Sequence, residues 1–172
     1  MNPFLQNLTI FNTSHAQDTT STKFSFTCQP DCSAYIGARD EPHSFIEFPI
    51  EFKTKLEQDP FVKMPDHNEP TTENLFLNTT TAGREVVGQI TAYASFILGS
   101  QYRTHMFLVL IFKKFARLIR WDHGGAVVTE PIKYDTQPHL FDFFIRYDNT
   151  NQATRGHDIT VAFFTKEGEQ DA

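Results

Sequence analysis

Two neighbouring segments of the chain alternate hydrophobic and polar residues, and a turn sequence separates them. They span residues 24–36 and 45–53, with Gly, Arg, Asp, Glu and Pro at 37–43 between them. Because successive side chains of a strand point to opposite faces, such segments bury one face and expose the other. Gly and Pro between them favour a reversal of the chain. We therefore expect an antiparallel pair of strands here.

The rest of the chain predicts two helices and a further set of strands. Residues 83–100 repeat apolar side chains at helical spacing, and residues 140–147 do so again. Residues 106–112 are apolar throughout, which is typical of a strand that is covered on both faces and central in its sheet. Residues 115–121 and 126–132 flank a turn sequence with two glycines, which predicts a β-hairpin.

These elements in this order predict an α/β fold with a mixed sheet flanked by helices. A chain of 172 residues with 40% hydrophobic residues suits one such domain, which we place at residues 24–148. Residues 1–23 are polar and expected to be loosely ordered, and residues 149–172 are expected to form a tail. Residues 55–81 contain three spaced prolines and are expected to form a loop or lid.

Charge narrows the classes of partner. The formal net charge is −6, which argues against a nucleic-acid binder that relies on bulk electrostatics. Residues 94–121 nevertheless lack Asp and Glu and carry five Arg or Lys residues, so a local basic surface is predicted. The same charges are equally expected on the outer face of a hairpin, where they maintain solubility.

Other sequence features are typical of an intracellular protein. No apolar stretch approaches a membrane span and the first residues do not resemble a signal peptide, so we expect no membrane partner and a cytoplasmic or nuclear location. Cys28 and Cys32 have no second cysteine pair to complete a zinc site and are expected to be reduced thiols. The 7 histidines lack the spacing of metal ligands and are expected on surfaces and turns.

The candidate chemistry begins with Glu51 and Lys53, which share one face of the second predicted strand. The opposite face carries three residues that are expected to be buried, Phe48, Ile50 and Phe52. Asp31 follows Pro30 in the preceding strand region, and antiparallel pairing is expected to bring it near Glu51. Two carboxylates beside an ammonium form a place where a divalent cation, a phosphate and a water can meet.

Each of these residues also has a purely structural interpretation. Glu51 and Lys53 can form an exposed ion pair, worth roughly 0–1 kcal/mol. Asp31 can simply end a strand after Pro30. The residues alone leave these interpretations open.

Three short motifs lie in a definite order on the predicted elements. The first strand region carries Pro30-Asp31, the second carries Glu51-Phe52-Lys53, and the long helix carries Gln89-Ile-Thr-Ala-Tyr93 before the buried strand. This order resembles the PD-(D/E)XK nuclease superfamily over roughly residues 24–112. The resemblance implies a restriction-endonuclease-like fold.

The resemblance also implies a role for each motif residue. Lys53 would position or activate the attacking water and stabilise transition-state charge. Gln89 and Tyr93 would contact DNA or RNA phosphate or orient the site, although a Tyr beside an apolar stripe is also typical of packing with a hydrogen-bonded hydroxyl. Mg²⁺ or Mn²⁺ would be held by two carboxylates and one backbone carbonyl, those of Asp31, Glu51 and Phe52. Nucleic-acid contacts are expected from five basic residues, Arg84, Lys113, Lys114, Arg117 and Arg120.

Two features depart from the superfamily pattern. The superfamily core usually begins with a helix that supplies a further acidic residue, whereas Asp18 is the only acid before Asp31 and lies in a segment without helical spacing. Cys32 directly follows the first expected metal ligand, and a thiol there favours oxidation over magnesium. Both features bear on activity rather than on the fold.

Several longer segments match a second family. They are Gly88-Gln89-Ile-Thr-Ala-Tyr93, the run from Arg103 through Ala-Arg-Leu-Ile-Arg-Trp-Asp122, Gly125-Ala-Val-Val-Thr-Glu130 and Arg155-Gly-His-Asp158. They resemble the region that precedes the catalytic lobes of fungal-type protein kinases. The kinase motifs themselves, from the glycine-rich ATP loop to Asp-Phe-Gly, are missing, so the chain is not a protein kinase by itself.

These observations leave three functions open. The first is hydrolysis of nucleic-acid phosphodiesters with Mg²⁺ or Mn²⁺. The second is a catalytically silent interaction or regulatory module whose partner is a kinase lobe or another protein. Its candidate contact is the surface around Ile119–Trp121, because an exposed Trp beside Arg suits interfaces. The third is binding of nucleic acid without cleavage.

Overall fold

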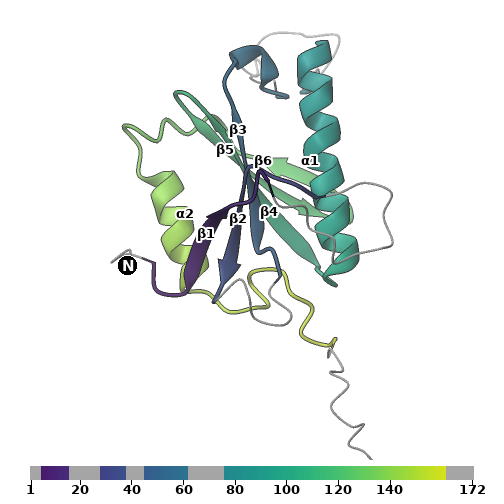
Figure 1. The fold of residues 1–172 in the computed structure, drawn as a ribbon, viewed down its shortest axis with the longest axis vertical. Coiled ribbons are helices and arrows are strands. Elements are labelled where there is room, and N and C mark those ends of the chain that lie inside the picture. Colours follow the sequence, from purple (N-terminus) through teal and green to yellow (C-terminus); the bar gives the residue numbers. More distant parts are fainter. Residues whose placement is uncertain (1–4, 16–27, 38–44, 62–75, 162–172) are drawn as a thin grey trace, which may run out of the picture.

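A six-stranded sheet forms the centre of the structure, a computed structural model that describes residues 5–15, 28–37, 45–61 and 76–161. Every strand pairs with the next one along the chain (Figure 1). β3 and β4 are parallel, and the other neighbouring pairs are antiparallel. The strands are β1 (Leu8–Asn12), β2 (Cys32–Ile36), β3 (Phe48–Lys53), β4 (His105–Phe112), β5 (Ala116–Asp122) and β6 (Gly125–Val128).

Two helices cover the two faces of this sheet (Figure 1). The longer helix, α1 (Thr81–Ser100), lies between β3 and β4 in the chain, where a parallel pair needs a crossover. It packs against one face of the sheet, and α2 (His139–Asp148) packs against the other. A short 3-10 helix, η1 (Leu56–Gln58), follows β3. The predicted α/β fold with a mixed sheet flanked by helices is therefore confirmed.

The central strand β4 is buried on both faces, as its continuous apolar sequence predicted. Three of its side chains lie in the core layer of α1, namely Met106, Leu108 and Leu110. The alternate side chains lie in the core layer of α2, namely Phe107, Val109 and Ile111. Each face of β4 thus contacts a helix, which explains why no polar residue interrupts it. Among the described residues, no helix has the length and apolar character of a membrane span.

The start of α1 is fixed by local contacts. The Thr80 hydroxyl accepts a hydrogen bond from the backbone N–H of Gly83 at 3.1 Å, which satisfies one free donor of the first turn. A Cβ atom at position 83 would lie 2.9 Å from atoms of Asn78, so glycine is required there. This fixed start determines which residues of α1 face the sheet.

Residues 8–12 form an ordered strand, so the expectation of a loosely ordered segment at 1–23 is wrong for them. β1 pairs with β2 along its whole length. The carboxylate of Asp148, at the end of α2, also accepts hydrogen bonds from the backbone N–H groups of Gln6 and Asn7, at 2.8 and 2.9 Å. Apolar packing adds to this backbone pairing, because Leu8 is buried in the core layer of α2 and Phe11 packs against the core layer of α1.

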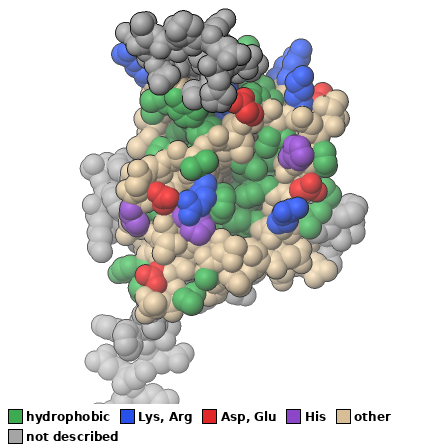
Figure 2. Space-filling model, turned by 180° about the vertical axis from the view of Figure 1, so that it is seen from behind, with side chains coloured by type: hydrophobic (Ala, Val, Ile, Leu, Met, Phe, Trp, Pro, Cys, Tyr) green, Lys and Arg blue, Asp and Glu red, His purple; other side chains and the backbone are tan. Residues whose placement is uncertain are grey.

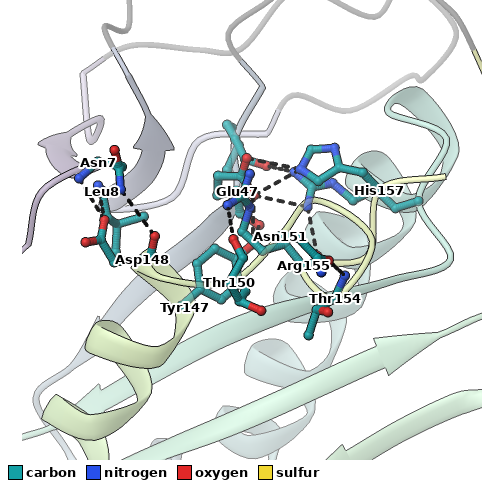
Figure 3. A network of polar contacts seen from close by, with 12 residues as sticks. Asn7, Leu8, Glu47, Tyr147, Asp148, Thr150, Asn151, Thr154, Arg155 and His157 are labelled. Atoms are coloured by element: carbon teal, nitrogen blue, oxygen red, sulfur yellow. Dashed lines mark hydrogen bonds and ion pairs between the residues drawn. The ribbon is translucent and has the colours of Figure 1, made fainter. Parts of the chain in front are cut away.

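A buried network around Glu47 holds the residues that follow α2 (Figure 3). The Tyr147 hydroxyl donates a hydrogen bond to the Glu47 carboxylate at 2.8 Å. Nitrogen atoms of Arg103, Arg155 and His157 lie 3.4, 3.5 and 3.1 Å from the same carboxylate. These partners come from the chain after α1, from α2 and from the C-terminal segment. The network therefore ties three distant parts of the chain to the residue preceding β3.

This network corrects the expectation of a tail at residues 149–172 for the part described. Arg155 and His157 return to the sheet because a carboxylate that is only 5% exposed needs compensating charge. Burial alone would raise the pKa of Glu47, but the hydrogen bond from His157 and the charge of Arg103 lower it to about 2. The ionised form of Glu47 is thus the form that the fold stabilises.

Phe52 is an exception to the burial that was expected on β3. Phe48 is 0% exposed and Ile50 is 3% exposed, whereas Phe52 is 49% exposed. The rings of Phe143 and Phe144 on α2 contact the ring of Phe48. The core cluster on the α2 side does not extend to Phe52, so the end of β3 is uncovered on that face.

We predict that Phe48→Ala lowers the free energy of unfolding by about 3–5 kcal/mol, because it leaves a cavity under α2. Phe52→Ala, on the same face of the same strand, should cost about 1 kcal/mol or less, since its ring is half exposed. Urea titration followed by circular dichroism measures both values. Equal losses in the two variants would contradict the difference in burial.

We also predict a loss of stability in acid that depends on Glu47. Its pKa falls from an ordinary 4.5 to about 2 on folding, so its contribution is complete above 4.5 and is lost as the pH falls through about 2. The stability difference between the wild type and Glu47→Gln should shrink by roughly 3 kcal/mol over this range. Glu130→Gln, at an exposed position, is the control and should show no such pH dependence. A constant difference between wild type and Glu47→Gln would refute the assignment.

Candidate functional site

The candidate site is centred on Glu51, a buried carboxylate on β3 that is 4% exposed. Its Oε1 atom accepts hydrogen bonds from Lys53 Nζ and Gln89 Nε2, both at 2.8 Å. Lys53 lies two residues further along the same strand, as the strand period predicted, and Gln89 comes from α1. The structural interpretation of Glu51 and Lys53 was an exposed ion pair. They do form an ion pair, but their side chains are only 5% and 12% exposed.

Residues of α1 complete the surroundings of Glu51. Gln89 also accepts a hydrogen bond from Lys53 Nζ at 2.8 Å, so amide, ammonium and carboxylate form a closed ring of contacts. Gln89 Nε2 lies 2.9 Å from the Tyr93 hydroxyl one helical turn later, and that hydroxyl donates to the backbone carbonyl of Gln29 at 3.0 Å. Burial and the charge of Glu51 raise the pKa of Tyr93, so its hydroxyl stays protonated.

Asp31 lies next to Glu51, as the expected antiparallel pairing required. The pairing of β2 with β3 ends at Cys32 opposite Ile50, so the residues just beyond this pair are neighbours. The backbone N–H of Asp31 faces Glu51 Oε2 at 3.4 Å, and Asp31 Oδ2 accepts a hydrogen bond from the backbone N–H of Phe52 at 2.8 Å. All five motif residues therefore meet in one place, from the start of β2, from β3 and from α1.

The donor set of this group fits a hard divalent cation. Asp31 and Glu51 offer carboxylate oxygens, and the backbone carbonyl of Phe52 is a further oxygen in the same strand, the ligand type that Mg²⁺ and Mn²⁺ favour. The described residues contain no group of three or more His, Cys, Asp and Glu side chains that could hold a metal. A cation here would therefore depend on two carboxylates together with backbone and water oxygens.

Cys32 lies beside the two carboxylates of the site, and their charges act on its thiol. Burial raises the pKa of this thiol, and the negative charges of Asp31 and Glu51 raise it further. Because the thiolate is the reactive form, these charges lower the reactivity of Cys32 as a nucleophile.

Two of the five expected nucleic-acid contacts are engaged within the chain, and Arg117 is excluded from such contacts by its burial. Arg117 is 4% exposed, and its Nε and Nη2 atoms bond to both carboxylate oxygens of Asp59 at 2.8 to 3.1 Å. Arg120 is paired with Asp122 at 2.9 Å. On the face shown in Figure 2, Lys and Arg side chains lie apart from one another. The remaining candidates are exposed, namely Arg84, Lys113 and Lys114.

The surface proposed around Ile119–Trp121 is also different from the expectation. Ile119 is 0% exposed and belongs to the core cluster beneath α1. Trp121 is partly buried and packs against that cluster, and its indole Nε1 has no hydrogen-bond partner among the described residues. The alternation of β5 thus turns Ile119 into the core, whereas Trp121 stays partly exposed and lines a pocket.

No protein-family model, curated protein or solved structure matches this chain. The function must therefore be inferred from the geometry and chemistry of the site. Two contributors to that geometry are backbone groups, the carbonyl of Gln29 and the N–H of Asp31. Sequence reasoning missed them because every residue has such groups and no side-chain pattern marks the ones that are used.

We predict that Asp31→Asn makes Cys32 react faster with iodoacetamide at neutral pH, because loss of a neighbouring negative charge increases the thiolate fraction. Asp135→Asn, at an exposed position elsewhere, is the matched control and should leave the rate unchanged. Peptide mass spectrometry resolves Cys32 from the buried Cys28. Identical alkylation rates in the wild type and Asp31→Asn would show that the carboxylate does not act on the thiol.

Proposed function

We propose that this chain is a nuclease-like phosphodiesterase that hydrolyses DNA or RNA with Mg²⁺ or Mn²⁺ at Asp31 and Glu51. One observation supports the proposal most strongly: the carboxylate of Glu51, an ammonium, an amide and a phenol form a continuous hydrogen-bonded group, which Asp31 joins through its backbone N–H. The contacts of this group join residues that lie up to 64 positions apart in the sequence, as Tyr93 and Gln29 do. Their order along the chain is also the order that the resemblance to PD-(D/E)XK nucleases implies.

The charge of the group favours a bound cation. Asp31 and Glu51 bring two negative charges, and Lys53 brings one positive charge into contact with Glu51. Glu47 provides the contrast, because two arginines and a histidine surround that single carboxylate. Asp31 is only partly buried, so its negative charge beside the buried Glu51 can attract a cation from solvent. The Glu51 group is therefore suited to a divalent cation, whereas the Glu47 network is suited to stabilising the fold.

In this proposal, Lys53 acts on the substrate. An ammonium has three donors, and Lys53 directs two of them to Glu51 and Gln89. The third donor can reach a phosphate oxygen or hold the attacking water, where its positive charge stabilises the transition state. Gln89 fixes Lys53 and Glu51 relative to each other, and Tyr93 fixes Gln89.

The bound ion would supply charge neutralisation for the phosphodiester and a lower pKa for its bound water. Asp31 and Glu51 would hold it, and the hydrogen bond from Phe52 N–H already orients the Asp31 carboxylate toward β3. The substrate that this proposal implies is intracellular DNA or RNA, in the cytoplasm or nucleus. Because the net charge is −6, binding would depend on local contacts such as Lys113 and Lys114.

A second candidate function is a catalytically silent interaction module that docks a kinase lobe or another protein. One observation favours it: both carboxylate oxygens of Glu51 already have partners within the chain, at 2.8 Å for Oε1 and 3.4 Å for Oε2. Such a closed network can stabilise a fold without binding a metal. Cation binding is therefore the measurement that separates the two functions.

We predict cleavage of labelled DNA or RNA with Mn²⁺ or Mg²⁺ and no cleavage with EDTA. Lys53→Ala should lower the cleavage rate by at least about 100-fold, because it removes the charge beside the reacting phosphate. Lys55→Ala is the matched control, since Lys55 is on the same segment but its side chain is 70% exposed. Its cleavage rate should equal that of the wild type.

Calorimetry with Mn²⁺ provides the second readout of the same prediction. Glu51→Gln should abolish the binding heat, and Glu57→Gln, whose carboxylate is 65% exposed, should retain it. Circular dichroism confirms that each variant is folded. Absence of cation binding and cleavage in the wild type, together with folded Asp31→Ala and Glu51→Ala variants, would favour the silent module.

A further inference from the structure

A pocket of about 740 Å³ opens immediately beyond the candidate site, where β3 and β4 end. The adjacency follows from the sheet register, because Lys53 of the site pairs with Phe112, which lines the pocket. Thr54, the residue after Lys53, lines it as well. The site and the pocket thus meet at consecutive residues, Lys53 at the end of β3 and Thr54 directly after it.

The walls of this pocket are apolar and held in place. Phe112 and Phe115 stack with their ring centroids 4.6 Å apart, and Leu56, which is 72% exposed, also lines the pocket. A further part of the wall comes from the segment that contains Pro131. The Tyr134 hydroxyl is within hydrogen-bond distance of the backbone carbonyls at 112 and 113, at 2.8 and 2.9 Å, which ties that wall to the end of β4. The pocket is therefore formed without a ligand.

The rim of the pocket is positively charged, although the chain as a whole is acidic. Lys113, Lys114 and Lys133 line it, and all three are exposed. Asp135 is the single carboxylate among the lining residues. An apolar interior below several ammonium groups is complementary to a planar base joined to a phosphate.

We infer that this pocket binds one nucleotide unit, with the base against the apolar walls and the phosphate at the lysines. The inference rests on the proposed function, because a strand whose base enters the pocket would continue toward Lys53. The base must be unpaired to enter, so the substrate class is single-stranded nucleic acid. The volume agrees with ordinary ligand pockets, which measure roughly 300–1,000 Å³.

The test measures binding without cleavage. Fluorescence anisotropy of a fluorescein-labelled single-stranded oligonucleotide is recorded in EDTA, with the matching duplex as a second probe and AMP as a competitor. The variants are Lys113→Ala combined with Lys114→Ala, and Leu56→Asp, which places a carboxylate at an exposed position of the rim. The control is Lys55→Ala, an exposed lysine that does not line the pocket.

The expected result is tighter binding of the single strand than of the duplex. Each pocket variant should raise the Kd for the single strand by about tenfold, and Lys55→Ala should leave it unchanged. If AMP displaces the oligonucleotide, a free nucleotide is enough to occupy the pocket. If AMP does not displace it, the nucleotide must be part of a strand. Both results support the pocket. No binding by the wild type, equal binding of duplex and single strand, or an unchanged Kd in both pocket variants would overturn the inference.

This readout is separate from that of the proposed function. Pocket-dependent binding without any metal-dependent cleavage would remove the hydrolytic function and leave the pocket. In the opposite case, the wild type cleaves, Lys53→Ala does not, and the pocket variants bind the single strand normally. That result would leave the hydrolytic function and remove the pocket.

Discussion

The carboxylate of Glu51, shared between Lys53 and Gln89, is the interaction on which the arrangement of the molecule depends. Glu51 lies on β3 and is 4% exposed. A carboxylate buried in this way is stable only if hydrogen-bond donors surround it. Lys53 can supply a charge because the strand period returns it to the same face, and Gln89 can reach it only if α1 lies across that face. The position of α1 is therefore set by polar contacts as well as by its apolar core residues.

Two buried carboxylates, one just before β3 and one near its end, lie in different charge environments. Glu47 is surrounded by Arg103, Arg155 and His157, and its pKa is lowered to about 2, so it is ionised and compensated. Glu51 and its neighbour Asp31 are two carboxylates, and the ammonium of Lys53 brings one positive charge to them, in contact with Glu51. The charge of Glu47 is therefore compensated within the fold, whereas the carboxylates of Glu51 and Asp31 together carry more negative charge than Lys53 supplies in return.

The parallel pairing of β3 with β4 places the candidate site and the pocket together. Parallel strands end at the same edge of the sheet, so Lys53 and Phe112 lie side by side although they are far apart in the chain. The crossover through α1 brings Gln89 to that edge from one side. The loop that starts at Pro131 closes it from another. Such an edge of an α/β sheet is a common location for ligand sites, because loops and helix ends meet there.

The sequence by itself determined most of the regular elements, although not β1, and which residues of the candidate site lie together. Side-chain period predicted β3, β4 and both helices, and the strand pairing that it implied placed Asp31 beside Glu51. Only the tertiary structure decided the pairing of β1, the exposure of Phe52, and the burial of Arg117 against a carboxylate 58 residues away. The reason is physical: period is a local property that each segment carries in its own residues. A bond between distant charges, or the edge at which a helix stops covering a strand, exists only once the segments are packed.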